Sequence, residues 1–246
     1  MNLQKTVQNK HLHWCQWFAG LVDADGCLLL NAKNYSCLEI TMGIHDEYAL
    51  QQIKKKLGGS VKLRTKAKAY RYRLHNKMGM LKALAFLNGH IRNSIRLSQL
   101  KKLCNHYNIL FIEPSLLTLD NAWFSGFFDG DGTLSFSFKK GWPQLVVSVS
   151  NKKAIDCLFF QELFGGSISL DKRCNTHKWQ LFKKTDIVFF CNYLKKHSLK
   201  SIKKKRIRLT STFFQLRSLR AYTYSQTSLQ YKSWVLFEKQ WFDNSS

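Results

Sequence analysis

Phe18-Ala19-Gly20-Leu21-Val22-Asp23-Ala24-Asp25-Gly26 is the stretch that decides the fold, because the chain repeats it as Phe124-Ser125-Gly126-Phe127-Phe128-Asp129-Gly130-Asp131-Gly132. A tryptophan stands directly before each copy, Trp17 and Trp123. An acidic motif near the start of each half of a 246-residue chain indicates two copies of one structural unit. We therefore expect the functional site to lie where the two copies meet, with one acid supplied by each.

Small residues recur at helical spacing inside each motif. Gly20 and Ala24 are four apart in the first copy, and Gly126 and Gly130 are four apart in the second. Residues at this spacing share one face of a helix, and small side chains let two helix backbones approach closely. The pattern predicts that each motif is a helix and that the two helices pack against each other.

The last acid of each motif, Asp25 or Asp131, then falls at the C-terminus of its helix. The helix dipole disfavours a negative charge there. Two carboxylates about 4 Å apart repel by about 4 kcal/mol at an effective dielectric near 20. A divalent cation would offset this repulsion, and hard carboxylate oxygens suit Mg²⁺, which commonly serves phosphate chemistry. We expect Mg²⁺ as the cofactor, with Mn²⁺ as a substitute and Ca²⁺ as an ion that binds without supporting cleavage.

The two motifs resemble the LAGLIDADG motif of homing endonucleases, and the two-copy layout resembles the single-chain members of that family. The resemblance implies an α+β fold of two pseudo-symmetric αββαββα repeats, with antiparallel sheets that form a saddle over double-stranded DNA. It also implies that the motif helices lie at the repeat interface and that Asp25 and Asp131 bind the catalytic metal. We place Ala24 and Gly130 beside them in the metal site. Asp23 and Asp129 match an earlier acid that the family uses more for structure.

The same resemblance suggests further catalytic residues. Family members often carry a basic residue beside the scissile phosphate, and Arg96 and Lys203 occupy the basic segments that follow the second helix of each repeat. The family commonly has lysine there, so Arg96 is a departure. A polar side chain at the end of the second strand, around His45 or Asn151, is expected to orient the attacking water.

An alternative interpretation starts from Asp129-Gly130-Asp131-Gly132-Thr133-Leu134, which also matches the nucleophile motif of haloacid-dehalogenase-type phosphatases. In that class the first Asp follows a buried strand. The duplication of the motif, the small residues at helix-packing positions and the charge of the chain all count against it. An EF-hand is excluded because the required Gly and distal Glu of the calcium loop are missing.

The charge of the chain points to a polyanionic partner. Lys and Arg number 39 against 15 Asp and Glu, a net charge of +24. No acid occurs between Glu47 and Glu113 or between Asp186 and Glu238. Because both acid-free stretches lie late in a repeat, we expect each repeat to present a basic face. The seven cysteines lack paired spacing, which favours reduced thiols in an intracellular compartment, an organelle if the gene lies in an organellar intron.

Periodicity predicts the order of elements after each motif. The first repeat, 1–104, and the second, 120–246, are expected to be joined by a linker over 105–119. We expect strand pairs and helices in the same order in both halves, and a terminal helix over 228–242. The first strand is predicted over 27–33 and a later helix of the first repeat over 96–107. The first helix after each motif is predicted over 47–57 and 154–164, ended by the glycine pairs at 58–59 and 165–166. No run of apolar residues is long enough to span a membrane.

Polar and basic residues alternate with apolar ones along the predicted strands, so that one face of each sheet is polar. A twisted β-ribbon fits the major groove, where such side chains read base edges. The candidate DNA-binding residues are Leu29, Asn31, Lys33, Thr41, Lys62, Arg64, Lys66, Arg71 and Arg73 in the first repeat and Thr133, Ser135, Ser137, Lys139, Gln144, Ser148, Lys178 and Gln180 in the second.

These features together predict a monomeric, metal-dependent endonuclease that cuts double-stranded DNA at a long asymmetric site, without a membrane or an obligate protein partner. Since no splicing domain flanks the motifs, we expect a free-standing or intron-encoded form. The main alternative is an RNA maturase that binds its host intron RNA and assists splicing, because it would share the fold, the charge and the motifs.

Overall fold

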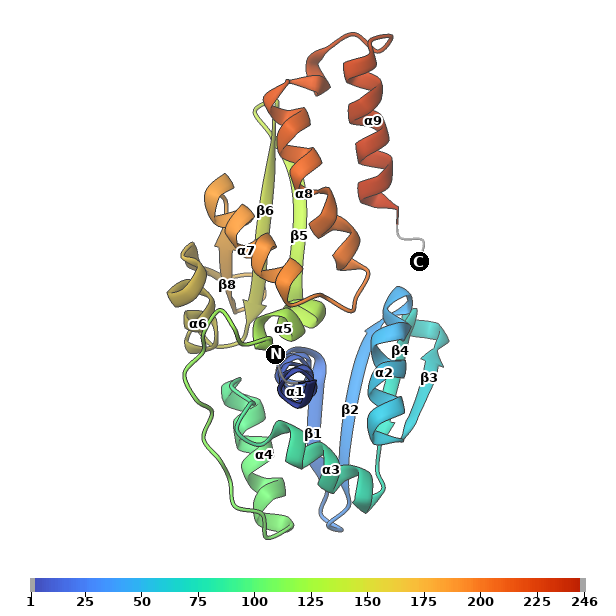
Figure 1. Cartoon of the computed structure of the whole chain (residues 1–246), viewed down its shortest axis with the longest axis vertical. Coiled ribbons are helices and arrows are strands. Elements are labelled where there is room, and N and C mark those ends of the chain that lie inside the picture. Colours follow the sequence, from blue (N-terminus) through green and yellow to red (C-terminus); the bar gives the residue numbers. More distant parts are fainter. Residues whose placement is uncertain (1–2, 244–246) are drawn as a thin grey trace.

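Two four-stranded antiparallel sheets, one from each half of the chain, flank a central pair of helices in the computed structural model (Figure 1). The structure describes the backbone of residues 3–243 and the side chains of residues 7–243. The first half contains α1 (Leu3–Asp25), β1 (Gly26–Leu30), β2 (Ser36–Gly43), α2 (Glu47–Leu57), β3 (Ser60–Arg64), β4 (Ala69–Leu74), α3 (Lys77–Leu87) and α4 (Ser94–His106). The second contains α5 (Trp123–Asp131), β5 (Gly132–Lys139), β6 (Trp142–Asn151), α6 (Ile155–Phe164), β7 (Ser167–Asp171), β8 (Thr176–Leu181), α7 (Lys184–Lys196), α8 (Lys203–Ser218) and α9 (Leu229–Phe242).

The predicted α+β fold with two αββαββα repeats is confirmed, and each repeat carries a further helix, α4 or α8. The sheets share one topology, with strand orders β1-β2-β4-β3 and β5-β6-β8-β7. Gly26 pairs with Ile40 in the first sheet, and Gly132 pairs with Val149 in the second. The final glycine of each motif is therefore the first residue of its sheet, directly after the last motif acid.

One face of each sheet packs on helices. Leu38, Ile40 and Tyr72 are fully buried on the first sheet, and their neighbours in sequence point the other way, as the two-residue period of a strand requires. Figure 1 shows α2 over the strands of the first sheet and α6 over those of the second. Within residues 7–243, the side chains on the opposite face of each sheet are mostly exposed or partly exposed.

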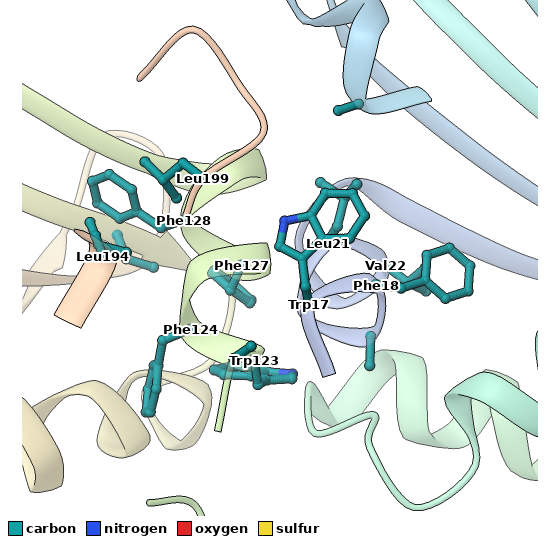
Figure 2. Packing of buried hydrophobic residues seen from close by; sticks show 14 of the residues in the cluster. Trp17, Phe18, Leu21, Val22, Trp123, Phe124, Phe127, Phe128, Leu194 and Leu199 are labelled. Atoms are coloured by element: carbon teal, nitrogen blue, oxygen red, sulfur yellow. The ribbon is translucent and has the colours of Figure 1, made fainter. Parts of the chain in front are cut away.

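The motif helices α1 and α5 touch backbone to backbone. A Cβ atom added at Gly20 would lie 2.0 Å from the carbonyl oxygen of Trp123, and one added at Gly126 would lie 1.8 Å from the carbonyl oxygen of Trp17. The two contacts join equivalent residues of the two motifs, so the interface follows the sequence repeat. Figure 2 shows both indoles in the space between the helices, with Phe127 and Leu21 beside them. The packing predicted from the small residues is confirmed.

Glycines end the first helix after each motif. Gly58 and Gly165 follow α2 and α6 with φ of 78° and 69°, a left-handed conformation that side chains with a Cβ rarely adopt. Their N–H groups bond back to the carbonyls of Lys54 and Gln161. The predicted end points of both helices are confirmed.

The C-terminal part of the second repeat extends the hydrophobic core along the β5–β6 hairpin. Helices α8 and α9 pack against β5 through an aromatic cluster around Phe136, whose ring lies 5.4 to 5.8 Å from those of Phe213, Trp234 and Trp241. Figure 1 shows α9 lying beside α8 at this end of the molecule. The terminal helix predicted over 228–242 is confirmed as α9.

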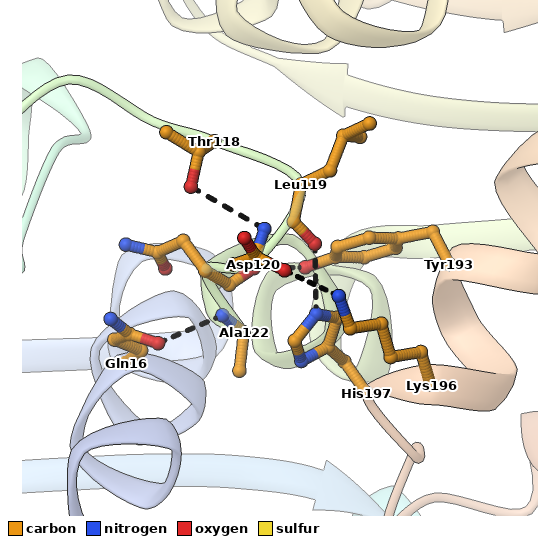
Figure 3. Close-up of polar contacts among 9 residues, drawn as sticks. Gln16, Thr118, Leu119, Asp120, Ala122, Tyr193, Lys196 and His197 are labelled. Atoms are coloured by element: carbon orange, nitrogen blue, oxygen red, sulfur yellow. Dashed lines mark hydrogen bonds and ion pairs between the residues drawn. The ribbon is translucent and has the colours of Figure 1, made fainter. Parts of the chain in front are cut away.

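The segment between α4 and α5 is tied to both halves of the molecule (Figure 3). Tyr193 donates from its hydroxyl to the carbonyl oxygen of Asn121 at 2.6 Å, and His197 donates from Nε2 to that of Leu119 at 2.9 Å. The N–H of Ala122 donates to Oε1 of Gln16 on α1 at 3.0 Å. The N-terminus of α5 is therefore held between α1 and the end of α7.

Two further properties follow from the described residues. All seven cysteines are free thiols, six of them wholly or partly buried. None of the helices in residues 3–243 combines the length and the apolar character needed to cross a bilayer.

Candidate active site at the ends of two packed helices

Asp25 and Asp131 are the last residues of α1 and α5, the two helices that pack together. Ala24 lies against Gly130 across the interface, and a Cβ atom added at Gly130 would come within 3.1 Å of Oδ2 of Asp25. The carboxylate of Asp25 therefore reaches the neighbouring helix directly beside Asp131. The structure brings all four residues of the predicted metal site together.

Burial and mutual repulsion act on this acid pair. Burial, and then the negative charge of Asp131, raises the pKa of Asp25 to about 7. Burial by the surrounding chain also raises the pKa of Asp131, although its outer side remains exposed to solvent. Both carboxylates are thus less stable as anions than an ordinary surface Asp, and a bound cation would relieve this strain.

Two basic side chains from different repeats face the acid pair. Lys203, at the start of α8, donates from Nζ to the carbonyl oxygens of Phe128 and Asp129 at 3.0 and 2.9 Å and to that of Gly130 at 2.5 Å, so it caps the end of α5. Burial lowers the pKa of Lys203, and the nearby carboxylates of Asp129, Asp25, Asp46 and Asp131 oppose this.

Arg96 lies near the start of α4 and approaches from the first repeat. Its guanidinium donates to Oε1 of Gln99 at 3.2 Å. Its positive charge partly opposes the rise in the pKa of Asp25 and of Asp131 that burial causes. The predicted pair of basic residues is therefore placed at the acids by two different helices.

The earlier acids of the motifs are buried parts of the scaffold. Asp23 accepts the N–H of Arg92 and the indole N–H of Trp123, both at 2.7 Å. Asp129 accepts the N–H of Lys200 at 2.8 Å and the indole N–H of Trp17 at 2.7 Å. Because Asp129 lies in a helix with its oxygens occupied, the phosphatase interpretation is wrong.

Asp46 is an acid near the site that the sequence analysis did not select. It ends the short helical turn Ile44–Asp46, where the neighbouring His45 is exposed to solvent. Oδ1 of Asp46 accepts the N–H of Ile202 at 2.8 Å, and its charge contributes to the raised pKa of Asp25. Because Asp46 directly follows His45, the sequence could have suggested it as a candidate. Its contact with Ile202 of the second repeat could not be predicted from the sequence.

Asn151, the other residue that was expected to orient the attacking water, lies in a buried polar network. It accepts a hydrogen bond from Nδ2 of Asn93 at 3.3 Å and donates to the carbonyl oxygen of Asp156 at 3.2 Å. Asp156 in turn accepts the N–H and the hydroxyl of Ser94 at 2.8 and 3.0 Å. Asp156 thus holds the start of α4 from the other repeat, as Asp46 holds the segment before α8.

The donor set at the helix ends fits a hard divalent cation, because it offers two carboxylates with solvent access for waters. The carbonyl of Gly130 is already bonded to Lys203. Within residues 7–243, no group of three or more His, Cys, Asp or Glu side chains is arranged to hold a metal. A metal at this site would therefore rest on Asp25 and Asp131, completed by water or a phosphate oxygen.

The first sheet turns a basic face away from its helices. Lys62 pairs with Arg71 across β3 and β4, and Arg73 is the next outward residue on β4. An acid lies among them: Glu39 of β2 forms ion pairs with Arg73 at 2.7 Å and with Arg71 at 3.6 Å. The exposed or partly exposed candidates on the strands of this sheet are Leu29, Thr41, Lys62, Arg64, Arg71 and Arg73.

Three candidates of the first repeat lie outside the strands. β1 ends at Leu30, before the predicted end of the strand, because Oδ1 of Asn31 accepts the N–H groups of Lys33 and Tyr35 and forms a tight turn. Asn31 and Lys33 are therefore in this turn. Lys66 lies in the short helical turn Thr65–Ala67.

The second sheet presents a more polar and less charged face. Thr133 pairs with Ser148, and Ser148 pairs with Gln180, so these residues lie side by side across three strands. Ser148 is only 5% exposed because it sits between its neighbours. The other candidates of this sheet are exposed or partly exposed: Thr133, Ser135, Ser137, Lys139, Gln144, Lys178 and Gln180.

Comparison with known proteins connects this geometry to a family. Residues 18–107 match the family model described as LAGLIDADG endonuclease. The chain is 40% identical over 98% of its length to a probable intron-encoded endonuclease aI2 of Debaryomyces hansenii, and 44% identical over 96% to the intron-encoded RNA maturase bI4 of Saccharomyces cerevisiae. It spans only 39% and 38% of those two relatives.

A shorter relative is covered almost completely. The chain is 32% identical to the intron-encoded DNA endonuclease ai2b of Dictyostelium discoideum, over 92% of this chain and 88% of the relative. Among solved structures, the homing endonuclease I-GzeII in complex with its DNA target aligns with a TM-score of 0.65 at 17% identity, covering 91% of this chain and 97% of that one. The endonuclease I-SmaMI with uncleaved DNA and calcium aligns with a TM-score of 0.67 at 14% identity, covering 92% and 97%. These two structures share the fold.

Proposed function

Because this chain belongs to the LAGLIDADG endonuclease family, we propose that it is a site-specific endonuclease that hydrolyses both strands of DNA with the help of a divalent metal ion. The observation that carries the proposal is the meeting of Asp25 and Asp131 at the ends of α1 and α5, with Lys203 and Arg96 facing them. This site lies between two sheets whose open faces are polar or basic, so a duplex on the sheets would pass over the acids.

In the proposed reaction, Asp25 and Asp131 hold the metal, with Mg²⁺ as the physiological ion and Mn²⁺ as a substitute. The ion supplies Lewis-acid chemistry, lowering the pKa of bound water and neutralising charge on the phosphate. Arg96 and Lys203 bring positive charge to the same place from opposite repeats, where they would stabilise the negative charge that develops on each strand. We assign the role of orienting water to Asp46, which is fixed by the N–H of Ile202 and whose charge acts on Asp25.

We propose that one chain is sufficient, with repeats over 1–104 and 120–246 joined by residues 105–119. The site takes one acid from each repeat, so a single chain completes it. The two open sheet faces differ, because the register-equivalent residues of Lys62, Arg64, Arg71 and Arg73 in the second sheet are Ser169, Asp171, Lys178 and Gln180, of which only Lys178 is basic. Unequal faces favour an asymmetric DNA site.

A cleavage selection tests the proposed function. The protein is incubated with a randomised duplex DNA library and Mg²⁺, and cleaved molecules are sequenced. We expect one long asymmetric site to be enriched, and no enrichment with Asp25→Asn or Asp131→Asn, which should still bind that site. Full cleavage by either variant would remove the acids from the proposed mechanism.

A second candidate function is RNA maturation, favoured by the 44% identity to a relative named RNA maturase. In this role the chain would bind its host intron RNA and assist splicing. If the Asp25→Asn variant, which lacks one of the two metal-binding acids, still assists splicing of that RNA, the two functions are separate.

We further propose that the protein works in a reducing compartment, which is an organelle where the gene lies in an organellar intron. The seven free thiols support this proposal.

A further inference from the structure

A cationic cavity of about 250 Å³ lies toward the opposite end of α1 from the acids. It is lined by Lys10, His13, Trp14 and Trp17 of α1, by the start of α5 and by the segment Lys196–Lys200 that follows α7. A rise of 1.5 Å per residue separates Lys10 from Asp25 by about 22 Å along the helix. The cavity is therefore distinct from the site at the helix ends.

Positive charge dominates the walls of this cavity. Lys10 and Lys200 line it, and Lys56 and Lys204 lie close enough that their charges lower the pKa of Lys200. Lys196, which also lines the cavity, is paired with Asp120 (Figure 3). His197 is not a source of charge here, because burial lowers its pKa and its Nε2–H is bonded to Leu119.

Lys200 has no counterion in direct contact among the described side chains. Its Nζ lies 4.3 Å from the centre of the Trp17 ring, a cation–π contact that leaves its N–H groups free to donate. Burial is the main cause of its lowered pKa, and only the buried Asp129 opposes it. An anion in the cavity would restore the favourable environment that the ammonium group has lost.

The indole of Trp14 supplies a second, independent sign of a missing ligand. Trp14 is 8% exposed, and its Nε1–H is buried without a hydrogen-bond partner among the described residues. Buried N–H groups are almost always bonded, so an unpaired one on a residue that lines the cavity is a candidate donor to an acceptor oxygen there. Lys56 lies over the same ring, with Nζ 4.8 Å from its centre, so positive charge surrounds this indole.

We propose that this cavity is a phosphate-binding pocket, which takes one backbone phosphate of a nucleic acid that runs outside the two sheets, with Lys10, Lys200 and the indole N–H of Trp14 as donors. A phosphate group has several acceptor oxygens and can satisfy these donors together. A volume of 250 Å³ holds the phosphate while its ester groups extend toward solvent. Free inorganic phosphate offers the same acceptor oxygens and is the alternative ligand for this pocket.

The test follows the indole N–H of Trp14 by ¹⁵N NMR, assigned with Trp14→Phe, during titration with inorganic phosphate at constant ionic strength in chloride. We expect a saturable shift of this signal. In Lys10→Gln/Lys200→Gln the apparent affinity should fall about tenfold or more, the equivalent of 1.4 kcal/mol. The charge-matched control Lys82→Gln/Lys232→Gln changes exposed lysines on α3 and α9 and should keep the affinity of the original protein.

Two results would overturn the pocket: a Trp14 signal that does not move with phosphate, or one that moves equally in both double variants. A short RNA oligonucleotide and a DNA duplex then replace phosphate in the same titration. A shift of Trp14 with either one, lost in Lys10→Gln/Lys200→Gln, supports a backbone phosphate. A response to inorganic phosphate alone assigns the pocket to free phosphate and overturns the nucleic-acid source. The titration measures binding and not cleavage, so its result does not depend on whether the proposed endonuclease activity is correct.

Discussion

The indole N–H of Trp17 on α1 donates a 2.7 Å hydrogen bond to Oδ2 of Asp129 on α5, so the first repeat is bonded to a buried acid of the second. Trp123 donates the same bond, also 2.7 Å, in the other direction, to Asp23. Each acid further accepts a backbone N–H from its own repeat, Arg92 for Asp23 and Lys200 for Asp129. The earlier motif acids thus join the repeats and hold the segments that lead to Arg96 and Lys203.

Replacing Trp17 with Phe should lower the free energy of unfolding by about 1–3 kcal/mol, because a buried carboxyl oxygen of Asp129 loses a hydrogen-bond donor. Urea denaturation measures the change. Trp142→Phe is the control, since Trp142 is 45% exposed at the far end of the β5–β6 hairpin. Equal effects of the two substitutions would mean that the bond to Asp129 does not stabilise the interface.

Gly126→Ala should destabilise the protein by about 4 kcal/mol or more, because its Cβ would lie 1.8 Å from a backbone oxygen of α1 that cannot move independently. Gly43→Ala is the matched control. Its Cβ meets nothing closer than Oδ2 of Asp46 at 3.6 Å, and Gly43 has an ordinary φ of −57°. Thermal unfolding of both variants compares the sites, and a stable Gly126→Ala protein would contradict the packing of α1 on α5.

Asp25→Asn should abolish cleavage and stabilise the metal-free protein by about 1–3 kcal/mol at pH 8. The pKa of Asp25 is raised from 3.8 to about 7 in the folded state. Between these values the folded protein keeps a proton that the unfolded chain has released, so its stability falls as pH rises. The advantage of the variant should therefore shrink as the pH is lowered from 8 toward 4, as measured by denaturant titrations at several pH values.

Two comparisons sharpen this test. Mg²⁺ should raise the Tm of the original protein and leave that of Asp25→Asn nearly unchanged, since a ligand stabilises only the state that binds it. Asp120→Asn should gain no stability at pH 8, because the ion pair with Lys196 lowers the pKa of Asp120 and favours its charged form. A variant at Asp25 that is less stable than the original protein at pH 8 would refute the proposed strain between the acids.

Glu39→Gln should strengthen binding to non-specific DNA and weaken discrimination between sequences. The substitution removes an acid from the basic face of the first sheet and releases Arg73 and Arg71, which Glu39 holds at 2.7 and 3.6 Å. Arginines that are positioned in advance read base edges, whereas released ones favour phosphates. Binding to target and random duplexes across a salt series measures both effects.

Glu113→Gln provides the matched control for Glu39→Gln. It removes the same charge, and Glu113 also pairs with a cation, Lys101, at 3.0 Å, but it lies between α4 and α5. Its ratio of specific to non-specific affinity should stay unchanged. A similar loss of discrimination in both variants would show that the effect comes from net charge alone.

Local elements were predictable from the sequence because their signals are local. The prediction of a helix over Glu47–Leu57 matches α2, because apolar periodicity and the following Gly58 depend on neighbouring residues only. The predicted start of α4 at Arg96 was two residues late, since Asn93 caps the helix by accepting the N–H groups of Ile95 and Arg96. The pairing of the two motif helices was also predictable, because the repeat itself encodes it.

The rest of the site depends on contacts between distant segments. Asp46 is bonded to Ile202, and Asp156 to Ser94, and no local pattern links these residues. The ion pairs of Glu39 depend on its register opposite Arg73, which is set by the packing of the whole sheet. The residue types that meet at the site, and the structural acids Asp23 and Asp129, were therefore predictable from the sequence, whereas the contacts of Asp46 and Asp156 between the repeats were not.

Lys203→Ala should slow cleavage strongly while leaving the preference among DNA sequences almost unchanged. Its ammonium group lies beside Asp25 and Asp131 and is proposed to act on the phosphate, which carries no base information. The substitution also removes the cap from three carbonyls of α5, so a structural loss must be separated from a chemical one. Lys205→Ala, two residues further along α8, is the control for the loss of a charge.

The decisive measurement is a profile of cleavage rates over all single-base variants of the target site, taken together with the Tm. A lower maximal rate with an unchanged profile and a small change in Tm supports the role of Lys203 at the phosphate. If the rate falls only in proportion to a loss of folded protein, Lys203 is a structural cap of α5. If the profile changes while the maximal rate is kept, Lys203 contributes to base recognition and not to the reaction, because a group that acts on the phosphate alone affects every sequence equally.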